Sequence, residues 1–422
     1  MKIASLPKLN LQSIACAVLA LLLFTTSCTK DKCETTRTYV RYNPVIKNLT
    51  EIRQFQVLPA QQMQAYGKIW LYGKYLLVNE PKKGIHIFDN SNPSSPQALS
   101  FISIPGNVDM AVRDNMLYAD NYMDMLVIDM HNPQTPALHK RMENTFTFYQ
   151  NADNNNSLVV DYEEELVTEK FENDCEGHDG TWMGISEKEN FLLDNSSAGG
   201  GGNVPSMGGS MARFSMYRNY LYILNQNQLH PFEISNAAEP VKRQWVQMNW
   251  GMETLFPYKD KLFVGANNGM YIYDLANAEK PVMLTHFRHA NACDPVVVEN
   301  DIAYVTLRSG TRCEGFANQL DVVDVKDVRN PKLLKTYPMY NPHGLGIDNG
   351  TLFICDGADG LKVYNASDIN SITDKMLGHY KNLDTYDVIP YNNILILTSK
   401  NGILQYDYSD PKNLKLLSKI AI

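Results

Sequence analysis

The chain has 422 residues, of which 44% are hydrophobic and 10% aromatic, and its formal charge is −8 at neutral pH. The hydrophobic share excludes a disordered chain, and the length allows two or three ordinary domains or one large repeat architecture. The negative charge argues against nucleic acid as a partner, because an acidic surface repels phosphate backbones.

The first segment of the chain has the character of a secretory signal. Lys2 and Lys8 precede an apolar run over residues 14–24, which is too short to span a membrane but suits the apolar region of a signal peptide. Loss of this segment removes two lysines and no acids, so the mature charge becomes −8 − 2 = −10.

A lipid attachment site follows this apolar run. The stretch TTSC resembles a bacterial lipobox ending at Cys28, with Thr25 where the usual motif has an aliphatic residue. The resemblance implies that residues 1–27 are removed as a lipoprotein signal peptide and that Cys28 is acylated; an ordinary signal peptide is the alternative. The next residues, CTKDK, resemble the export signal of some Gram-negative surface lipoproteins, which implies an outer-membrane anchor and surface exposure.

Short strands that end in an acid or its substitute recur along the chain. The recurring positions are Asp89, Asp129, Glu233, Asp274, Asp324, Asn365 and Asp407. Most steps are close to forty residues, while one step of 104 and one of 50 indicate insertions. Such a fixed period is typical of propellers and solenoids.

Each repeat contains four strand-like runs. In the second repeat they begin at Asp109, Met116, Met125 and Ala137, and they are rich in β-branched and aromatic residues. We find no stretch with the apolar spacing of a helical solenoid. The sequence therefore predicts an all-β fold, a seven-bladed β-propeller of four-stranded antiparallel blades.

The acid that ends the third strand has a structural explanation. An Asp or Asn side chain such as that of Asp129 can accept hydrogen bonds from backbone N–H groups two or three residues on, and the nearby proline stops the strand. Seven copies of a catalytic acid would serve no purpose. We therefore expect these residues to cap turns.

Several of the repeats resemble a known family. The runs LVIDMHNP, LDVVDVKDVRNP and GLKVYNASD resemble the LVIVD repeat of secreted or lipid-anchored bacterial and archaeal proteins. The resemblance covers roughly residues 67–422 apart from one insertion. It implies a propeller but no activity, because the family has no established one.

The domain organisation follows from these patterns. We expect a tether and lead-in segment at residues 28–60 and the propeller at residues 61–422, with an insertion at about residues 148–210. The segment from Ile52 is expected to add a strand that helps close the ring. The insertion and the enlarged loop at residues 308–319 are predicted to share one face of the propeller, because both occupy connections on that side.

Five cysteines remain after Cys16 and Cys28 are set aside. Cys293 and Cys313 are expected at the tips of neighbouring loops, on the face that carries the insertion and the enlarged loop. We therefore predict a disulfide between them. Cys175 and Cys355 could also pair, and Cys33 is a rival partner for either.

Polar residues at the starts of the first strands define a candidate ligand site at the channel mouth. They are Asp109, Glu253, Asp294, His343 and Asp387, opposed by Arg213. A cation or polar-ligand site is one interpretation. Loop acids that cap turns are the other, and we favour it.

No local motif indicates a cofactor, a metal or a catalytic centre. In HFRHANAC, His286 and His289 would point to opposite sheet faces, and a disulfide would occupy Cys293. The stretch CDGADG is better explained as a hairpin turn than as a calcium loop. Nucleophile elbows, triads and zinc helices do not occur as local patterns.

The function expected from the sequence is binding. We expect a monomeric, lipid-anchored binding or scaffold module outside the cytoplasm, acting on an envelope or extracellular protein or glycan. The alternative is a hydrolytic or lyase enzyme acting on a polysaccharide or similar substrate at the channel mouth.

Overall fold

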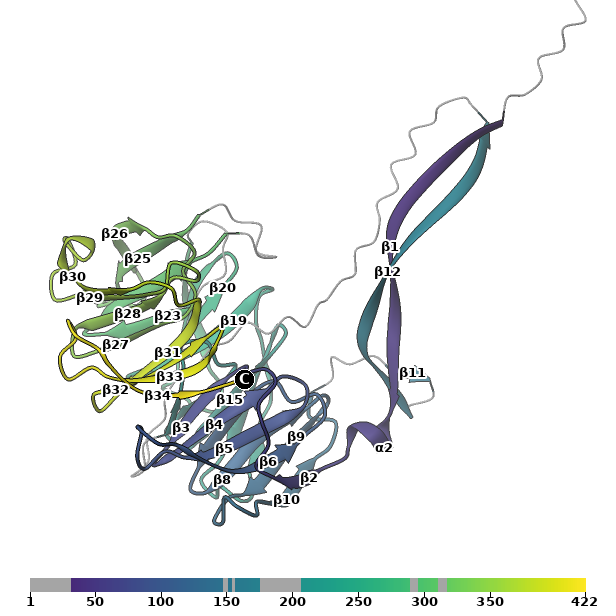
Figure 1. Ribbon diagram of the computed structural model, residues 1–422, viewed down its shortest axis with the longest axis horizontal. Helices are drawn as coiled ribbons and strands as arrows, with labels where there is room; N and C mark the ends of the chain where they lie inside the picture. Colours follow the sequence, from purple (N-terminus) through teal and green to yellow (C-terminus); the bar gives the residue numbers. More distant parts are fainter. Residues whose placement is uncertain (1–31, 147–150, 154–155, 175–205, 289–294, 310–316) are drawn as a thin grey trace, which may run out of the picture. The chain divides into compact units, whose positions relative to one another are not determined.

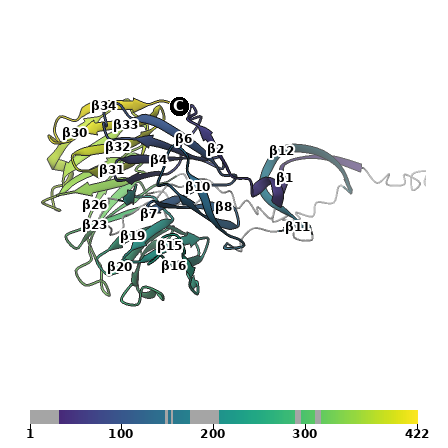
Figure 2. The same cartoon turned by 90° about the horizontal axis from the view of Figure 1, so that it is seen from below.

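The computed structural model describes residues 32–146, 151–153, 156–174, 206–288, 295–309 and 317–422. The described strands form seven antiparallel sheets of four or more strands that follow one another around a ring (Figures 1 and 2). The predicted all-β, seven-bladed propeller is therefore confirmed. The first strands of neighbouring blades contact each other, which places them closest to the axis.

The blades are built from consecutive strands. Blade 1 contains β3 (Ile69–Tyr72), β4 (Tyr75–Glu80), β5 (Gly84–Asp89) and β6 (Gln97–Ser103), and blade 2 contains β7 (Met110–Arg113), β8 (Met116–Asn121), β9 (Asp124–Asp129) and β10 (Ala137–Met142). Blade 3 contains β14 (Phe214–Tyr217), β15 (Tyr220–Asn225), β16 (Gln228–Glu233), β17 (Val241–Lys242) and β18 (Val246–Gln247). Blade 4 contains β19 (Met252–Tyr258), β20 (Lys261–Ala266), β21 (Gly269–Asp274) and β22 (Val282–Phe287). Blade 5 contains β23 (Val296–Glu299), β24 (Ile302–Leu307), β25 (Gln319–Asp324) and β26 (Lys332–Pro338). Blade 6 contains β27 (Leu345–Asp348), β28 (Thr351–Cys355), β29 (Leu361–Asn365) and β30 (Met376–Tyr380), with the short helix η1 (Thr373–Lys375) before β30. Blade 7 contains β31 (Thr385–Tyr391), β32 (Ile394–Ser399), β33 (Gly402–Asp407) and β34 (Lys415–Ile420).

Blade 1 gains a strand on each edge. Strand β2 (Gln56–Pro59) pairs with β6 on the outer edge, so the segment from Ile52 does add a strand. The expectation that this strand helps close the ring is wrong, because it pairs only within blade 1. Strand β13 (Ser206–Gly208) pairs with β3 on the inner edge, next to the axis. Blade 1 and blade 7 meet through packing of apolar side chains, among them Ile69 and Ile396, so the ring closes between two complete sheets.

The predicted role of the repeated acid is confirmed. In six of the seven repeats, its side chain accepts a hydrogen bond of 2.8–3.1 Å from the backbone N–H two residues later, as Asp129 does from His131. Glu233 instead accepts from the hydroxyl of Ser235. A second Asn or Asp three positions on repeats the same contact, as Asn132 does with Gln134. Each turn between the third and fourth strands is thus fixed by its own side chains.

Residues 32–45 and 161–174 belong to a separate compact unit. Its described part pairs two long strands, β1 (Lys32–Asn48) and β12 (Ser157–Asp174), and the short strand β11 (Asn151–Asp153) pairs with the start of β12. We call residues 32–45 and 161–174 the arm. The helix α2 (Leu49–Ile52) follows β1. In the part of the chain that the structure describes, no helix is long and apolar enough to cross a membrane.

Candidate functional site

Four charged residues of alternating sign lie at the first strands of four consecutive blades. Blades 7, 1, 2 and 3 contribute, in that order, Asp387, Lys68, Asp109 and Arg213. The last three directly precede the first strand of their blade, and Asp387 is the third residue of β31. Asp387, Lys68 and Asp109 are almost completely buried. Two of the candidate ligand residues, Asp109 and Asp387, therefore lie close to the axis, together with a lysine that sequence reasoning missed.

The end of the insertion binds residues at the first strands of four blades. We call residues 206–213 the axial segment; it runs from β13 on blade 1 to the start of blade 3. Ser210 donates to Asp387 Oδ1 from its backbone N–H and its hydroxyl, both at 3.1 Å, and accepts from the Leu345 N–H at 2.8 Å. One serine thus joins blades 6 and 7 to the insertion.

The other end of the axial segment binds blades 1 and 2. Lys68 Nζ donates to the carbonyl of Met211 at 2.8 Å and lies 3.8 Å from Asp109 Oδ2. Asp109 Oδ2 accepts from the backbone N–H groups of Arg213, at 2.6 Å, and Phe214, at 3.2 Å. The carboxylates therefore act here as acceptors for main-chain donors that would otherwise be buried without partners.

Burial affects the pKa of both acids. It raises the pKa of Asp109, against the opposing effect of Lys68, and it raises the pKa of Asp387 to about 7. Close packing also limits which residues can lie beside them: a Cβ on Gly209 would come 2.0 Å from Asp387 Oδ2. The glycine lets the backbone approach the carboxylate.

The other candidate ligand residues have different positions. Glu253 is half-buried at the start of β19, and Asp294 lies outside the described residues. His343 accepts a hydrogen bond at Nδ1 from Arg308 at 2.9 Å and packs edge-on against Tyr386, with ring centroids 5.3 Å apart. Burial and the charge of Arg308 lower the pKa of His343 to about 3, so the ring is neutral at physiological pH.

The cysteines are only partly described. Cys28, Cys293 and Cys313, which carry the predicted lipid and disulfide, lie outside the described residues. Cys355 is a free and fully buried thiol, so the pairing considered for it does not form. No group of three or more His, Cys, Asp or Glu side chains that could hold a metal ion occurs within the described ranges.

A small cavity opens between blades 2 and 3, beside the axial segment. Its lining includes Asp109, Asp120, Tyr122, Phe146, Arg213 and Asn225. Asp120 Oδ1 accepts from the backbone N–H groups of Val108, at 2.8 Å, and Asp109, at 3.0 Å. Burial raises the pKa of Asp120 to about 7, so this carboxyl can exchange a proton near neutral pH.

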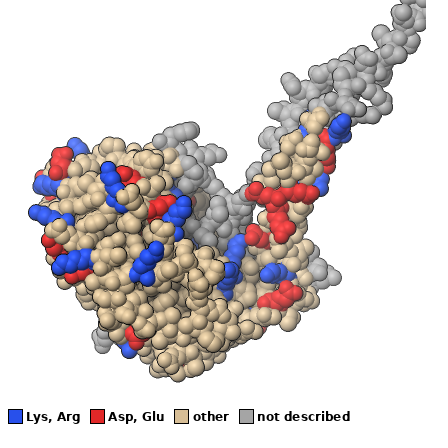
Figure 3. All heavy atoms as spheres, in the orientation of Figure 1, with Lys and Arg blue, Asp and Glu red and all other residues tan. Residues whose placement is uncertain are grey.

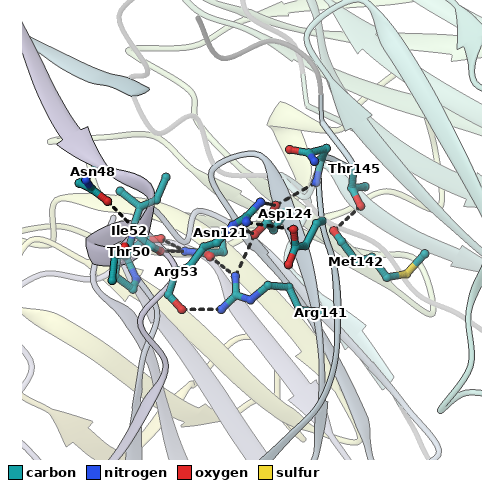
Figure 4. A network of polar contacts seen from close by, with 12 residues as sticks. Asn48, Thr50, Ile52, Arg53, Asn121, Asp124, Arg141, Met142 and Thr145 are labelled. Atoms are coloured by element: carbon teal, nitrogen blue, oxygen red, sulfur yellow. Dashed lines mark hydrogen bonds and ion pairs between the residues drawn. The ribbon is translucent and has the colours of Figure 1, made fainter. Parts of the chain in front are cut away.

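A charged cluster ties the lead-in segment to blade 2 (Figure 4). Asp124 is fully buried and accepts from Arg53 Nε at 2.9 Å and from Arg141 Nη1 at 3.1 Å. Asn121 donates to the carbonyl of Ile52 at 2.7 Å, and Arg141 donates to the carbonyl of Arg53 at 2.8 Å. The end of α2 is thereby fixed to the propeller.

Comparison with known proteins identifies the fold and one repeat. The LVIVD repeat family matches residues 66–102, which is blade 1. The periplasmic gluconolactonase PpgL of Pseudomonas aeruginosa is similar at 10% identity, with 84% of this chain and 96% of that chain covered and a TM-score of 0.53.

Two further solved structures are similar at lower scores. BamB of Moraxella catarrhalis is similar at 9% identity, with 89% of this chain and 88% of that chain covered and a TM-score of 0.47. The computationally designed protein Ika8 is similar at 10% identity, with 85% of this chain and 87% of that chain covered and a TM-score of 0.48. No curated protein matches the sequence. The chain thus carries an LVIVD repeat in its first blade and shares the fold of the gluconolactonase structure.

Proposed function

We propose that the protein is a lipid-anchored binding module of the bacterial cell envelope, held in the outer membrane through Cys28 and binding a protein or glycan. The leader and the lipobox-like stretch support this location. The observation that carries the binding role is the structural use of two predicted ligand acids: Asp109 and Asp387 accept hydrogen bonds from the axial segment and so hold the fold together.

Exposed aromatic side chains support one face as the binding surface. Trp250 is 69% exposed between blades 3 and 4, and Tyr340 is 62% exposed between blades 5 and 6. Connections from a fourth strand to the next first strand share one face of a propeller. Exposed Trp and Tyr side chains are the residues that most often anchor a partner.

The binding role can be tested with the full lipidated chain. Tagged protein is cross-linked in its native envelope, and bound proteins and glycans are quantified by mass spectrometry and on a glycan array. Trp250→Ala with Tyr340→Ala should remove the specific partner, whereas Leu333→Ala, an exposed residue of the outer strand β26, should keep it. Identical partner sets for all three proteins would contradict the proposal.

The anchor needs its own measurement. Cys28→Ser should abolish incorporation of labelled fatty acid and release the protein from the membrane fraction, while the unchanged chain stays bound. Equal labelling of both proteins would remove the lipid anchor from the proposal.

The cavity favours a second candidate, an enzyme acting on a polysaccharide or similar substrate. Asp120 faces this cavity with a pKa of about 7, which suits a general acid. Asp120→Asn should abolish turnover of an envelope polysaccharide, whereas Asp114→Asn, at an exposed acid of the same blade, should not. Lack of turnover by the unchanged chain over a panel of such polymers would exclude this candidate.

A further inference from the structure

Three loops at the junction of blades 3 and 4 lie on one face of the propeller. Two of them connect the second and third strands of their blades, and the third connects blade 3 to blade 4. We call these loops, together with the strand residues next to them, the amide surface. It comprises residues 225–228, 247–251 and 267–268.

Backbone hydrogen bonds join the three loops into one surface. The N–H of Met248 donates to the carbonyl of Asn227 at 2.8 Å, and the N–H of Asn267 donates to the carbonyl of Gly251 at 2.9 Å. Gly251 has a φ of +74°, and a Cβ on it would lie 2.1 Å from Asn267 Oδ1. The middle loop is therefore bonded to a loop on each side, and its glycine allows the close contact with Asn267.

The amide surface differs from the rest of the chain in composition. Eight of its eleven residues are Asn or Gln, and none of these eight is buried. None of the eleven residues is charged, although 20% of the whole chain is. On the part of the propeller that Figure 3 shows, by contrast, acidic and basic side chains lie close together. The three loops thus present a neutral surface of hydrogen-bonding groups.

Trp250 projects from the amide surface. The buried side chains of Met248 and Met252 hold both ends of its loop in the apolar core shared by blades 3 and 4. Trp250 itself is 69% exposed, and Asn249 beside it is exposed as well. The indole is therefore presented on a backbone that is already fixed, which reduces the entropy lost when a ligand binds.

Most amides of this surface have unused hydrogen-bonding capacity. The side chains of Asn225, Gln226, Gln228 and Asn249 form no hydrogen bond within the described ranges of the chain, whereas Gln247 donates to two backbone carbonyls. A side-chain amide both donates and accepts, as a hydroxyl group does. A ligand with many hydroxyl groups and no charge therefore matches these side chains.

We propose that the amide surface binds an uncharged glycan, with one sugar ring packed against Trp250. This inference rests on the proposed binding function and narrows the partner to one chemical class. A sugar ring has C–H groups that pack against the face of an indole and hydroxyls that pair with amides. An acidic glycan would require Lys or Arg, and a protein partner would require an apolar centre around the tryptophan. The amide surface has neither.

The first test compares neutral with acidic polysaccharides. The full chain, in a detergent without a sugar headgroup, is titrated by calorimetry with starch, mannan, xylan and β-1,3-glucan, and with alginate and polygalacturonate. At least one neutral polymer should bind, and its dissociation constant should change less than about twofold between low and high salt, because no charges are paired. Binding of the acidic polymers alone would overturn the inference.

The second test locates the site with matched aromatic variants. Trp250→Ala should raise the dissociation constant for the bound neutral polymer at least about tenfold, whereas Trp250→Phe should retain most of the affinity. Tyr340→Ala removes an exposed aromatic side chain from another loop of the same face and should leave the constant unchanged. Circular dichroism should show that all three variants fold. Equal losses in Trp250→Ala and Tyr340→Ala, or no loss in Trp250→Ala, would overturn the inference.

Other outcomes separate this inference from the proposed binding function. A chain that binds a specific envelope protein but none of the neutral polymers would contradict the glycan assignment and leave the binding function intact. A chain that binds neither a protein nor a glycan would contradict both.

Discussion

Asn90 and Gln405 exchange two hydrogen bonds between the first and last blades. Asn90 Nδ2 donates to Gln405 Oε1 at 2.8 Å, and Gln405 Nε2 donates to Asn90 Oδ1 at 2.7 Å. Both side chains are buried, and 315 positions separate them in the chain. Because the two blades share no strand, this amide pair supplements the apolar packing that closes the ring.

Breaking this pair should weaken ring closure. Gln405→Leu leaves the amide of Asn90 buried without its partner, so we expect the free energy of unfolding to fall by about 1–3 kcal/mol, measured by urea denaturation. Leucine at both positions should lose less than the sum of the two single changes, because both polar groups then disappear together. Gln134→Leu, at an exposed amide, is the control; an equally large loss there would contradict the assignment.

The axial segment should tolerate no side chain at residue 209. Gly209→Ala places a Cβ 2.0 Å from Asp387 Oδ2, and we expect a loss of about 1–3 kcal/mol in the free energy of unfolding. In an Asp387→Ala background, the same change should cost much less, because the clashing oxygen is gone. Additive losses in this double-mutant cycle would show that the contact is not the cause.

His230 should make the fold sensitive to acid. It is 1% exposed, neither ring nitrogen has a hydrogen-bond partner in the described structure, and it packs edge-on against Phe146, with ring centroids 5.8 Å apart. Burial, aided by the charge of Lys242, lowers the pKa of His230 from 6.5 to about 4. The folded state therefore disfavours the protonated ring.

The pH range follows from this shift. Above pH 6.5 the ring is neutral in the folded and the unfolded state, so protonation of His230 does not affect the free energy of unfolding. As the pH falls from 6.5 towards 4, the free energy of unfolding decreases, by up to about 3 kcal/mol. His343 acts in the same direction, while Asp120 and Asp387, with raised pKa values, act in the opposite one. The difference between the unchanged chain and His230→Leu, from denaturation curves at several pH values, isolates His230. A constant difference from pH 7 to pH 4 would contradict this account.

Asp124 should hold the lead-in segment on blade 2. Asp124→Ala leaves the guanidinium groups of Arg53 and Arg141 without their buried acceptor, so we expect a loss of about 3–5 kcal/mol. Hydrogen exchange should rise first at the backbone of residues 49–53. Asp114→Asn, at an exposed acid, should change neither quantity, and unchanged exchange at residues 49–53 in Asp124→Ala would refute this role.

Local patterns in the sequence were sufficient for the blades. The caps at Asp129 and its equivalents act on residues two positions away, so periodicity and turn chemistry reveal them. The same reasoning identified Asp109 and Asp387 as residues at the starts of first strands. It could not reveal that both bind main-chain groups, because Arg213 lies 104 residues from Asp109 and Ser210 lies 177 from Asp387.

The arm and Lys68 were missed for related reasons. The pairing of Thr38 with Thr168 spans 130 residues, and neither strand has a neighbour in sequence that would indicate its partner. A usable signal exists in the opposite charges of the two segments, basic before residue 48 and acidic after residue 160. Lys68 could have been found from its position, since it precedes the first strand of its blade just as Asp109 does.

The axial segment also dictates the order in which the molecule can be completed. Ser210 is synthesised before Leu345 and Asp387, its partners 135 and 177 residues farther along. Until the last two blades emerge from the ribosome, Ser210 lacks these hydrogen-bond partners. The axial segment can therefore reach its final arrangement only after the last sheet has formed.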